Sequence, residues 1–349
     1  MQNLMIDEKD YLLNKINDYI KLNREEVLLD PKNNRFCLYP IKYNSLWSLY
    51  KKQQSSFWKA EEIDFSHDYD DWIKLSEDEQ YVIKMILAFF ANTDGIVNLN
   101  ISSNLLNEIT VNEAKVTYTY QMMIENIHNE CYTLMLDNLI RDTIEKKHLF
   151  DAINTIPSIK KISDWALKWA DNECETNIGN RIVAFACIEG ILFSGAFATI
   201  FWLKKYKGSG KLFMPGLTKS NEFIARDEGF HTEFACELFS LLINKPTKEE
   251  ILSIIEESVE IAKNFSIESI KCNLIGLNSI LMNQYIEYVA DRLIVSLGYD
   301  KIYKVTNPFT FMDTIGMMQK TNFHENRPTE YQSAYNTMNF TKLITSEDF

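Results

Sequence analysis

The residues of this chain best suited to chemistry include two pairs in which a glutamate precedes a histidine by three positions. Glu125 and His128 form one pair, and Glu228 and His231 form the other. On a helix this spacing places both side chains on one face, about one turn apart. Tyr132 follows His128 by four residues and falls on the same face. One pair is a weak signal, but two pairs in long apolar segments predict a metal site.

Two more acids interrupt apolar segments of helical period. Asp94 lies between Phe90 and Val97, and Glu189 is the one central acid of the strongly apolar stretch 177–205. An acid in apolar surroundings is costly unless it is paired or bound to a metal. For Asp94 alone, a hydrogen bond inside the helix explains the residue equally well.

Four carboxylates and two histidines therefore come from four predicted helices: Asp94, Glu125, His128, Glu189, Glu228 and His231. Bundles that bind two iron or two manganese ions use this set, with one acid from each of two helices and a Glu-x-x-His pair from each of the other two. Carboxylates neutralise two cations, and imidazole suits iron or manganese. Zinc would more often bring cysteine. The alternative is that each acid has its own hydrogen bond, but four uncompensated acids would destabilise a domain that is stable by only about 5–15 kcal/mol.

The remaining histidines lie in polar segments, and we expect them at the surface or in loops: His67, His148 and His324.

The bulk composition indicates a folded helical protein. The chain has 349 residues, 46% of them hydrophobic, with only 11 glycines and 7 prolines. Its net charge of −13 argues against nucleic acid as a main partner, because no basic surplus is available to neutralise phosphates. The six cysteines form no CxxC pair, and the first residues do not look like a signal peptide, so we expect a cytoplasmic protein. The apolar stretch 182–203 contains Glu189, which favours a buried core helix over a membrane span.

Three Ser/Thr-x-x-Glu capping boxes predict helix starts, at Ser76–Glu79, Thr110–Glu113 and Thr247–Glu250. Other helices are expected over 177–205, 217–243 and 275–297, with shorter pieces over 141–175. The aromatic cluster between residues 39 and 58 is expected in the core. The predicted organisation is an N-terminal arm (1–34), one domain (35–306) and a flexible C-terminal tail (307–349).

These motifs resemble the small, radical-generating subunit of class I ribonucleotide reductase, and its eukaryotic and viral branch more than the bacterial one. The resemblance extends over about residues 35–331. The matching runs are FWKAEE (57–62), FFA with DGIVN (89–98), ENIH (125–128), EG with FSG (189–195), MPGL (214–217), RDEGFH (226–231) and KTNF (320–323).

The resemblance implies an all-α, ferritin-like helical bundle with a di-metal carboxylate site that holds two iron ions per chain, or manganese in their place. Asp94, Glu125 and His128 would bind one ion, and the other three ligands the second, with Glu125 and Glu228 able to bridge. Tyr132 would be oxidised to a stable radical when the reduced site meets dioxygen. Its apolar shield would consist of Phe193, Phe197 and Ile224.

The resemblance also implies a route for the radical and a partner. Trp58, Asp227 and His128 would form a hydrogen-bonded relay from the metal towards the surface, and Tyr331 would pass the radical to a large catalytic subunit that reduces ribonucleotides. The C-terminal tail would dock in that subunit. Residues 343–349 keep an acidic-aromatic end but lack the usual Phe-Thr-Leu-rich sequence, so cross-reaction with other large subunits is in question. A homodimer is expected, with no nucleic-acid or membrane partner.

Two other functions stay open on the residues alone. One is a different di-metal bundle oxidase, such as a desaturase-like enzyme, which would have no use for Trp58, Asp227 and Tyr331 together. The other is a non-catalytic iron-storage or regulatory paralogue, which would retain the ligands without forming a radical. The choice between iron and manganese and between a homodimer and a heterodimer is open as well.

Overall fold

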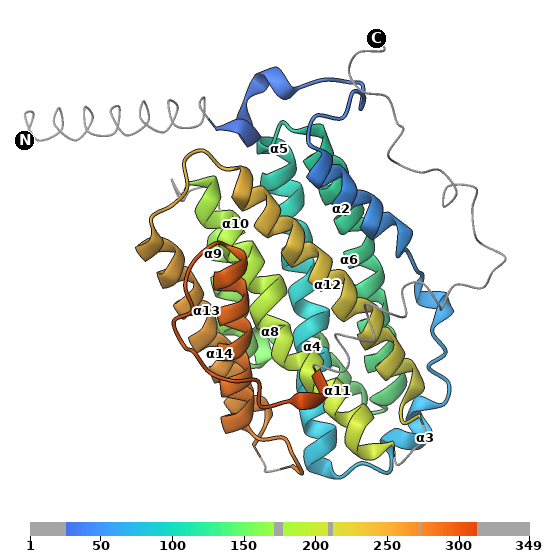
Figure 1. The fold of residues 1–349 in the computed structure, drawn as a ribbon. Coiled ribbons are helices and arrows are strands. Elements are labelled where there is room, and N and C mark those ends of the chain that lie inside the picture. The colour runs from blue at the N-terminus through green and yellow to red at the C-terminus, as the bar shows by residue number, and fades with distance from the viewer. Residues whose placement is uncertain (1–25, 171–176, 209–211, 272–273, 313–349) are drawn as a thin grey trace, which may run out of the picture.

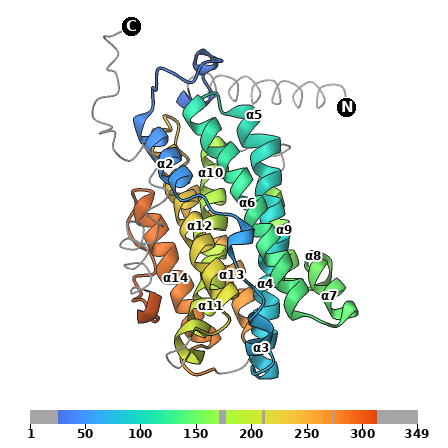
Figure 2. The same ribbon diagram turned by 90° about the vertical axis from the view of Figure 1, so that its right-hand side faces the viewer.

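The computed structural model describes residues 26–170, 177–208, 212–271 and 274–312. Across these ranges the regular structure is helical, apart from one isolated bridge between Leu274 and Leu277. Long helices lie side by side as an upright bundle, and the predicted all-α fold is confirmed (Figure 1). Seen from the side, α7 and α8 project from this bundle (Figure 2).

The helices follow one another as α2 (Asn44–Ser55), α3 (Asp68–Trp72), α4 (Glu77–Asn100), α5 (Leu106–Glu108), α6 (Asn112–Leu139), α7 (Thr143–Phe150), α8 (Ala152–Thr155), α9 (Pro157–Ala170), α10 (Ile178–Cys187), α11 (Ser194–Lys207), α12 (Pro215–Leu241), α13 (Lys248–Ser269) and α14 (Ser279–Ser296). Short 3-10 turns η1 (Val27–Leu29), η2 (Pro31–Asn33) and η3 (Ala60–Glu62) lie before α4, and π-helical turns η4 (Ile101–Leu105) and η5 (Ile188–Leu192) follow α4 and α10.

Two of the three predicted capping boxes are present. The Ser76 and Thr247 side chains each accept the third backbone N–H of their helix, α4 and α13, and the glutamate returns the bond. The prediction at Thr110 was wrong. Helix α6 begins after Val111 without a side-chain cap, because the Thr110 hydroxyl donates to the backbone oxygens of residues 28 and 30 and Glu113 pairs with Arg35. These two side chains join the segment before α2 to α6.

The apolar stretch expected as one helix over 177–205 is a continuous rod with an irregular turn. Helix α10 passes into η5, and α11 continues from there. A π-helical turn often marks a functional position, and Glu189 lies within this one. The stretches Glu77–Glu108 and Ile178–Lys207 are long and apolar enough to cross a membrane, but their apolar windows are 67% and 89% buried inside the fold.

The start of α12 is held by acids from α3. The two carboxylate oxygens of Asp68 accept the backbone N–H groups of Gly216 and Leu217 at 2.9 and 2.7 Å. A Cβ at Gly216 would lie 2.8 Å from the backbone oxygen of Asp64, so only glycine allows this approach. Because α12 carries Glu228 and His231, Asp68 fixes the end of a helix with two of the predicted ligands.

We expect Asp68→Ala to lower the free energy of unfolding by about 1–3 kcal/mol, because two buried N–H groups lose their acceptor. Asp70→Ala, an exposed acid on the same short helix, is the matched control and should change stability little. Urea denaturation of both variants measures the difference. Equal stability of the two would show that Asp68 does not hold the helix end.

The aromatic cluster over residues 39–58 is not uniformly part of the core, and that expectation was wrong. Trp58 is 2% exposed, whereas Tyr39 and Phe57 are 56% and 41% exposed. Trp47 and Tyr50 are half-buried on α2. Helix α2, which carries Trp47 and Tyr50, has one face against α6 and α12 and the other in solvent.

Candidate metal centre

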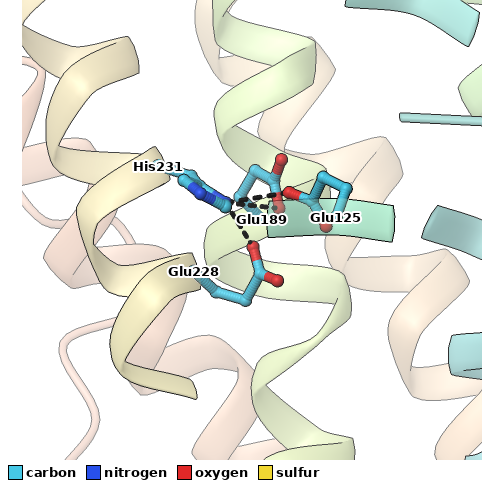
Figure 3. A group of neighbouring side chains, drawn as sticks. All are labelled: Glu125, Glu189, Glu228 and His231. Carbon is cyan, nitrogen blue, oxygen red and sulfur yellow. Dashed lines mark hydrogen bonds and ion pairs between the residues drawn. The ribbon is translucent and has the colours of Figure 1, made fainter. Parts of the chain in front are cut away.

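The fold brings the six predicted ligands together in one buried cluster. They come from α4 (Asp94), α6 (Glu125 and His128), η5 (Glu189) and α12 (Glu228 and His231). None of the six is more than 3% exposed. Figure 3 shows carboxylates from α6, η5 and α12 directed towards the ring of His231. Ligand atoms lie within 4.8 Å of one another in two groups, which share Glu125: Asp94, Glu125 and His128 in one, and Glu125, Glu189, Glu228 and His231 in the other.

Two carboxylates reach both histidines. One oxygen of Glu125 lies 3.1 Å from Nδ1 of His128, and its other oxygen lies 3.0 Å from Nδ1 of His231. Glu228 spans the same two nitrogens, at 3.0 and 2.8 Å. Each histidine therefore marks one candidate metal position, and Glu125 and Glu228 each have one oxygen at each of these candidate positions. This arrangement suits two cations that share two bridging carboxylates.

The other two acids complete the two positions. Neither oxygen of Asp94 has a hydrogen-bond partner among the described residues, and the same holds for Oε2 of Glu189. That Glu189 oxygen lies 4.0 Å from Nδ1 of His231. A buried carboxylate without a partner is costly, so an internal hydrogen bond does not explain Asp94. Metal ligation would satisfy both acids, and the donor set fits two hard cations.

The electrostatics of the cluster reflect its crowding. Burial, followed by the charges of Glu125 and Glu228, raises the pKa of Asp94 well above its usual range. Burial also raises the pKa of Glu189, with the same two glutamates adding to it. Burial alone would lower the pKa of His231, but Glu228 and Glu125 outweigh it and raise the pKa to about 9. Protons thus compete with metal for these ligands, and metal affinity should fall as the pH falls.

Gln121 belongs to the centre, although the sequence analysis did not identify it. Its side-chain N–H donates to Glu189 at 2.9 Å, and the residue is fully buried. Gln121 precedes Glu125 by four positions, so it lies on the same face of α6. A polar residue one turn before a predicted ligand was the available signal. If the cluster binds metal, Gln121 would orient the Glu189 carboxylate without being a ligand itself.

Tyr132 lies in an apolar pocket beside the cluster. The ring is 1% exposed, and its hydroxyl has no hydrogen-bond partner within the described part of the chain. Phe90 stacks on it with ring centroids 4.5 Å apart, and the expected shield residues Phe193 and Phe197 pack against Phe90. Burial, followed by the charge of Asp94, raises the pKa of Tyr132 well above its usual value. The phenol is therefore neutral and screened from water. Phe90 itself was not foreseen as part of the shield.

Trp58, Asp227 and His128 form a connected buried set. The indole N–H of Trp58 donates to Oδ2 of Asp227 at 2.7 Å, and Nε2 of His128 lies 3.3 Å from the same oxygen. Arg226 donates twice to the other oxygen of Asp227. Because Nδ1 of His128 faces Glu125 and Glu228, this histidine joins the carboxylate cluster to Asp227 and Trp58.

Spacing alone does not make a ligand pair, as a further Glu-x-x-His at Glu145 and His148 shows. It lies on the short helix α7, where His148 is exposed and Glu145 pairs with Lys84. His67 is exposed too, as expected. His324 and Tyr331 lie outside the described residues.

Comparison with known proteins gives a consistent result. The family model described as "Ribonucleotide reductase, small chain" matches residues 35–308. The ribonucleoside-diphosphate reductase small chain of Encephalitozoon cuniculi is 52% identical over 310 residues, covering 89% of this chain and 93% of the relative. Ribonucleoside-diphosphate reductase subunit M2 of Danio rerio is 50% identical, with 88% and 78% covered. The solved homodimer of ribonucleotide reductase Rnr4 from Saccharomyces cerevisiae is 33% identical with a TM-score of 0.75, covering 90% of this chain and 99% of that one.

Proposed function

This chain belongs to the ribonucleotide reductase small-chain family, and from that premise we propose that its buried cluster binds two metal ions and generates a radical on Tyr132. The chain is the small subunit of a ribonucleoside-diphosphate reductase, an oxidoreductase. A desaturase-like oxidase is no longer needed to explain the site. The complete ligand set and Tyr132 argue against a non-catalytic paralogue.

The single observation that carries the proposal is the pair of carboxylates that span both histidines. Glu125 and Glu228 would bridge two ions, each ion with one imidazole, and Asp94 and Glu189 would each complete one position. Bound metal would supply the activation of dioxygen and the one-electron oxidation of Tyr132. Iron is the proposed metal and manganese the alternative, because both accept this mixture of carboxylate and imidazole ligands.

The protein's own contribution is to hold the radical and to give it a defined exit. The phenylalanines around Tyr132 exclude water and offer no hydrogen to a phenoxyl radical, which would prolong its lifetime. We assign the exit to His128, Asp227 and Trp58, which are already in hydrogen-bond order. Beyond Trp58, Tyr331 would pass the oxidising equivalent to the large subunit, and the C-terminal tail would dock there. The tail would begin later than the predicted residue 307, because Phe309 is 2% exposed and packs against Tyr285 of α14.

A homodimer is the proposed assembly, as in the solved Saccharomyces cerevisiae relative. Leu99 on α4 and Met123 and Leu134 on α6 are 48%, 41% and 43% exposed. The two helices pack against each other, so these apolar side chains offer a surface for a second copy. A cytoplasmic location, without nucleic-acid or membrane partners, stays a prediction.

Reconstitution of the metal-free protein with ferrous iron and air tests the proposal. A tyrosyl signal in electron paramagnetic resonance, together with ribonucleotide reduction when a large subunit is added, is the expected result. Two bound ions without any radical would instead favour the non-catalytic paralogue, and the absence of bound metal would contradict the site.

Tyr331→Phe separates radical formation from radical delivery. We expect the variant to keep the full tyrosyl signal, because the change lies far along the chain from the ligands, and to lose reductase activity with the large subunit. Tyr299→Phe, a tyrosine within the predicted domain, serves as the control and should retain activity. Full activity of Tyr331→Phe would contradict its place in the relay.

A further inference from the structure

Four oxidisable rings form a row that leads from the neighbourhood of Asp227 to the protein surface. The ring centroids of Tyr120 and Tyr50 are 6.2 Å apart, those of Tyr50 and Trp47 are 5.2 Å apart, and those of Trp47 and Tyr39 are 6.2 Å apart. We call these four residues the α2 ladder, because Trp47 and Tyr50 lie on α2. Tyr120 is on α6, and Tyr39 lies just before α2 and is 56% exposed.

The inner end of the ladder and the Trp58–Asp227–His128 set both approach the end of α2. The Tyr120 hydroxyl donates to the backbone oxygen of Gln53 at 3.0 Å. Three residues later, the backbone oxygen of Ser56 accepts from Arg226, which also holds Asp227. Burial, followed by the charge of Asp227, raises the pKa of Tyr120 above its ordinary value, which is a further sign that the two groups are close.

The residue types distinguish this row from ordinary aromatic packing. The rings around Tyr132 are phenylalanines, which are not oxidised under biological conditions: Phe90 stacks on it, and Phe193 and Phe197 lie behind. The ladder contains only tyrosine and tryptophan, although the chain has 21 phenylalanines. Rings that resist oxidation thus surround Tyr132, whereas the ladder consists of rings that can be oxidised.

The proposed reaction leaves a need for such a row. Reduction of one dioxygen to two waters takes four electrons and four protons. A bound pair of metal ions would supply two of these electrons, one from each ion, and Tyr132 would supply a third. The fourth electron must come from outside the centre, and Trp58, only 2% exposed, gives a dissolved reductant little access.

We propose that the α2 ladder carries this fourth electron from a small anionic reductant at Tyr39 to the Trp58–Asp227–His128 set. The reductant, of the ascorbate class, is oxidised by one electron, and each ring is oxidised by its inner neighbour and then reduced by its outer one. A tyrosine that releases its proton regains it on reduction, so the ladder itself is unchanged. The Lys51 ammonium lies 5.6 Å from the Trp47 ring centroid and 5.7 Å from that of Tyr50, so its positive charge favours an anionic donor near the outer half of the ladder, where Trp47 contacts Tyr39.

The ladder is tested first on the metal-free protein, so that its outcome does not depend on the proposed function. A ruthenium photo-oxidant is attached to Cys37, which is exposed. The labelled chain carries Cys174→Ser and Cys272→Ser to confine the label to Cys37. It also carries Tyr39→Phe, so that the photo-oxidant oxidises Trp47 and the oxidation proceeds inwards. After a flash, we expect an indolyl radical that decays as a tyrosyl radical rises. Tyr50→Phe should abolish this transfer, whereas Tyr206→Phe, a half-exposed tyrosine away from the ladder, should not. Unchanged transfer in Tyr50→Phe would overturn the proposal.

The second measurement uses the iron-loaded full-length chain in air without reductant. A nitroso spin trap reacts with the radical, and peptide mass spectrometry identifies the labelled residue. We expect the label on Tyr39 in the wild type and no label there in Trp47→Phe. The control variant Trp169→Phe should still be labelled at Tyr39. Labelling of Tyr39 that survives Trp47→Phe contradicts the ladder. If no Tyr132 radical forms in any variant, the proposed function fails, and the flash experiment still decides whether the ladder conducts.

Discussion

Tyr132→Phe is expected to abolish both the tyrosyl radical and ribonucleotide reduction, with metal binding and the fold unchanged. The substitution removes only the hydroxyl, and that hydroxyl has no hydrogen-bond partner among the described residues. The ring would keep its stacking on Phe90. Because phenylalanine cannot be oxidised by the centre, activity should fall to the level of the metal-free protein. Paramagnetic resonance after addition of ferrous iron and air is the measurement, with reductase activity beside it.

Tyr118 provides a matched control for this experiment. It is also on α6, is fully buried, and has a hydroxyl without a partner in the described part of the chain. Burial, followed by the charge of Glu189, raises the pKa of this tyrosine too. Tyr118→Phe should keep the radical and the activity. Loss of the signal in Tyr118→Phe, or its survival in Tyr132→Phe, would show that the radical was assigned to the wrong tyrosine.

The ligand set could be predicted because helical periodicity carries most of the information. Glu125 and His128, like Glu228 and His231, are polar residues at helical spacing in apolar segments, and each pair does lie on one face of one helix. The exposed pair on α7 shows that the apolar surroundings matter as much as the spacing. The roles of these residues remain predictions.

Other features depend on contacts that no local pattern encodes. Thr110 looks like a helix cap, but its hydroxyl bonds to backbone oxygens about eighty positions earlier. The π-helical turn at Glu189 arises within an apolar run that reads as regular helix. The half-exposure of Trp47 and Tyr50 follows from the position of α2 at the edge of the bundle. Sequence reasoning therefore identified the residues that the fold brings together, and it missed the supports that distant segments provide.

Asp94→Asn should change stability in opposite directions without and with metal. Burial and neighbouring acids raise the folded-state pKa of Asp94 above its unfolded value. A raised pKa gives stability that is fully present below the unfolded pKa and is lost as the pH rises through the folded pKa. Asparagine cannot ionise, so the metal-free variant should match the wild type in acid and exceed it by about 1–3 kcal/mol at alkaline pH.

With metal the order should reverse, because the variant lacks an ionised ligand at one of the two positions. A ligand at a hundred times its dissociation constant stabilises a folded protein by about 2.7 kcal/mol, and Asp94→Asn should lose most of this gain. Urea denaturation across pH, with and without Mn²⁺ to avoid oxidation, measures both effects. Asp137→Asn, an exposed acid on α6, is the control and should follow the wild type throughout. A variant that is less stable without metal, or equally stabilised by it, would mean that Asp94 serves the fold and not the centre.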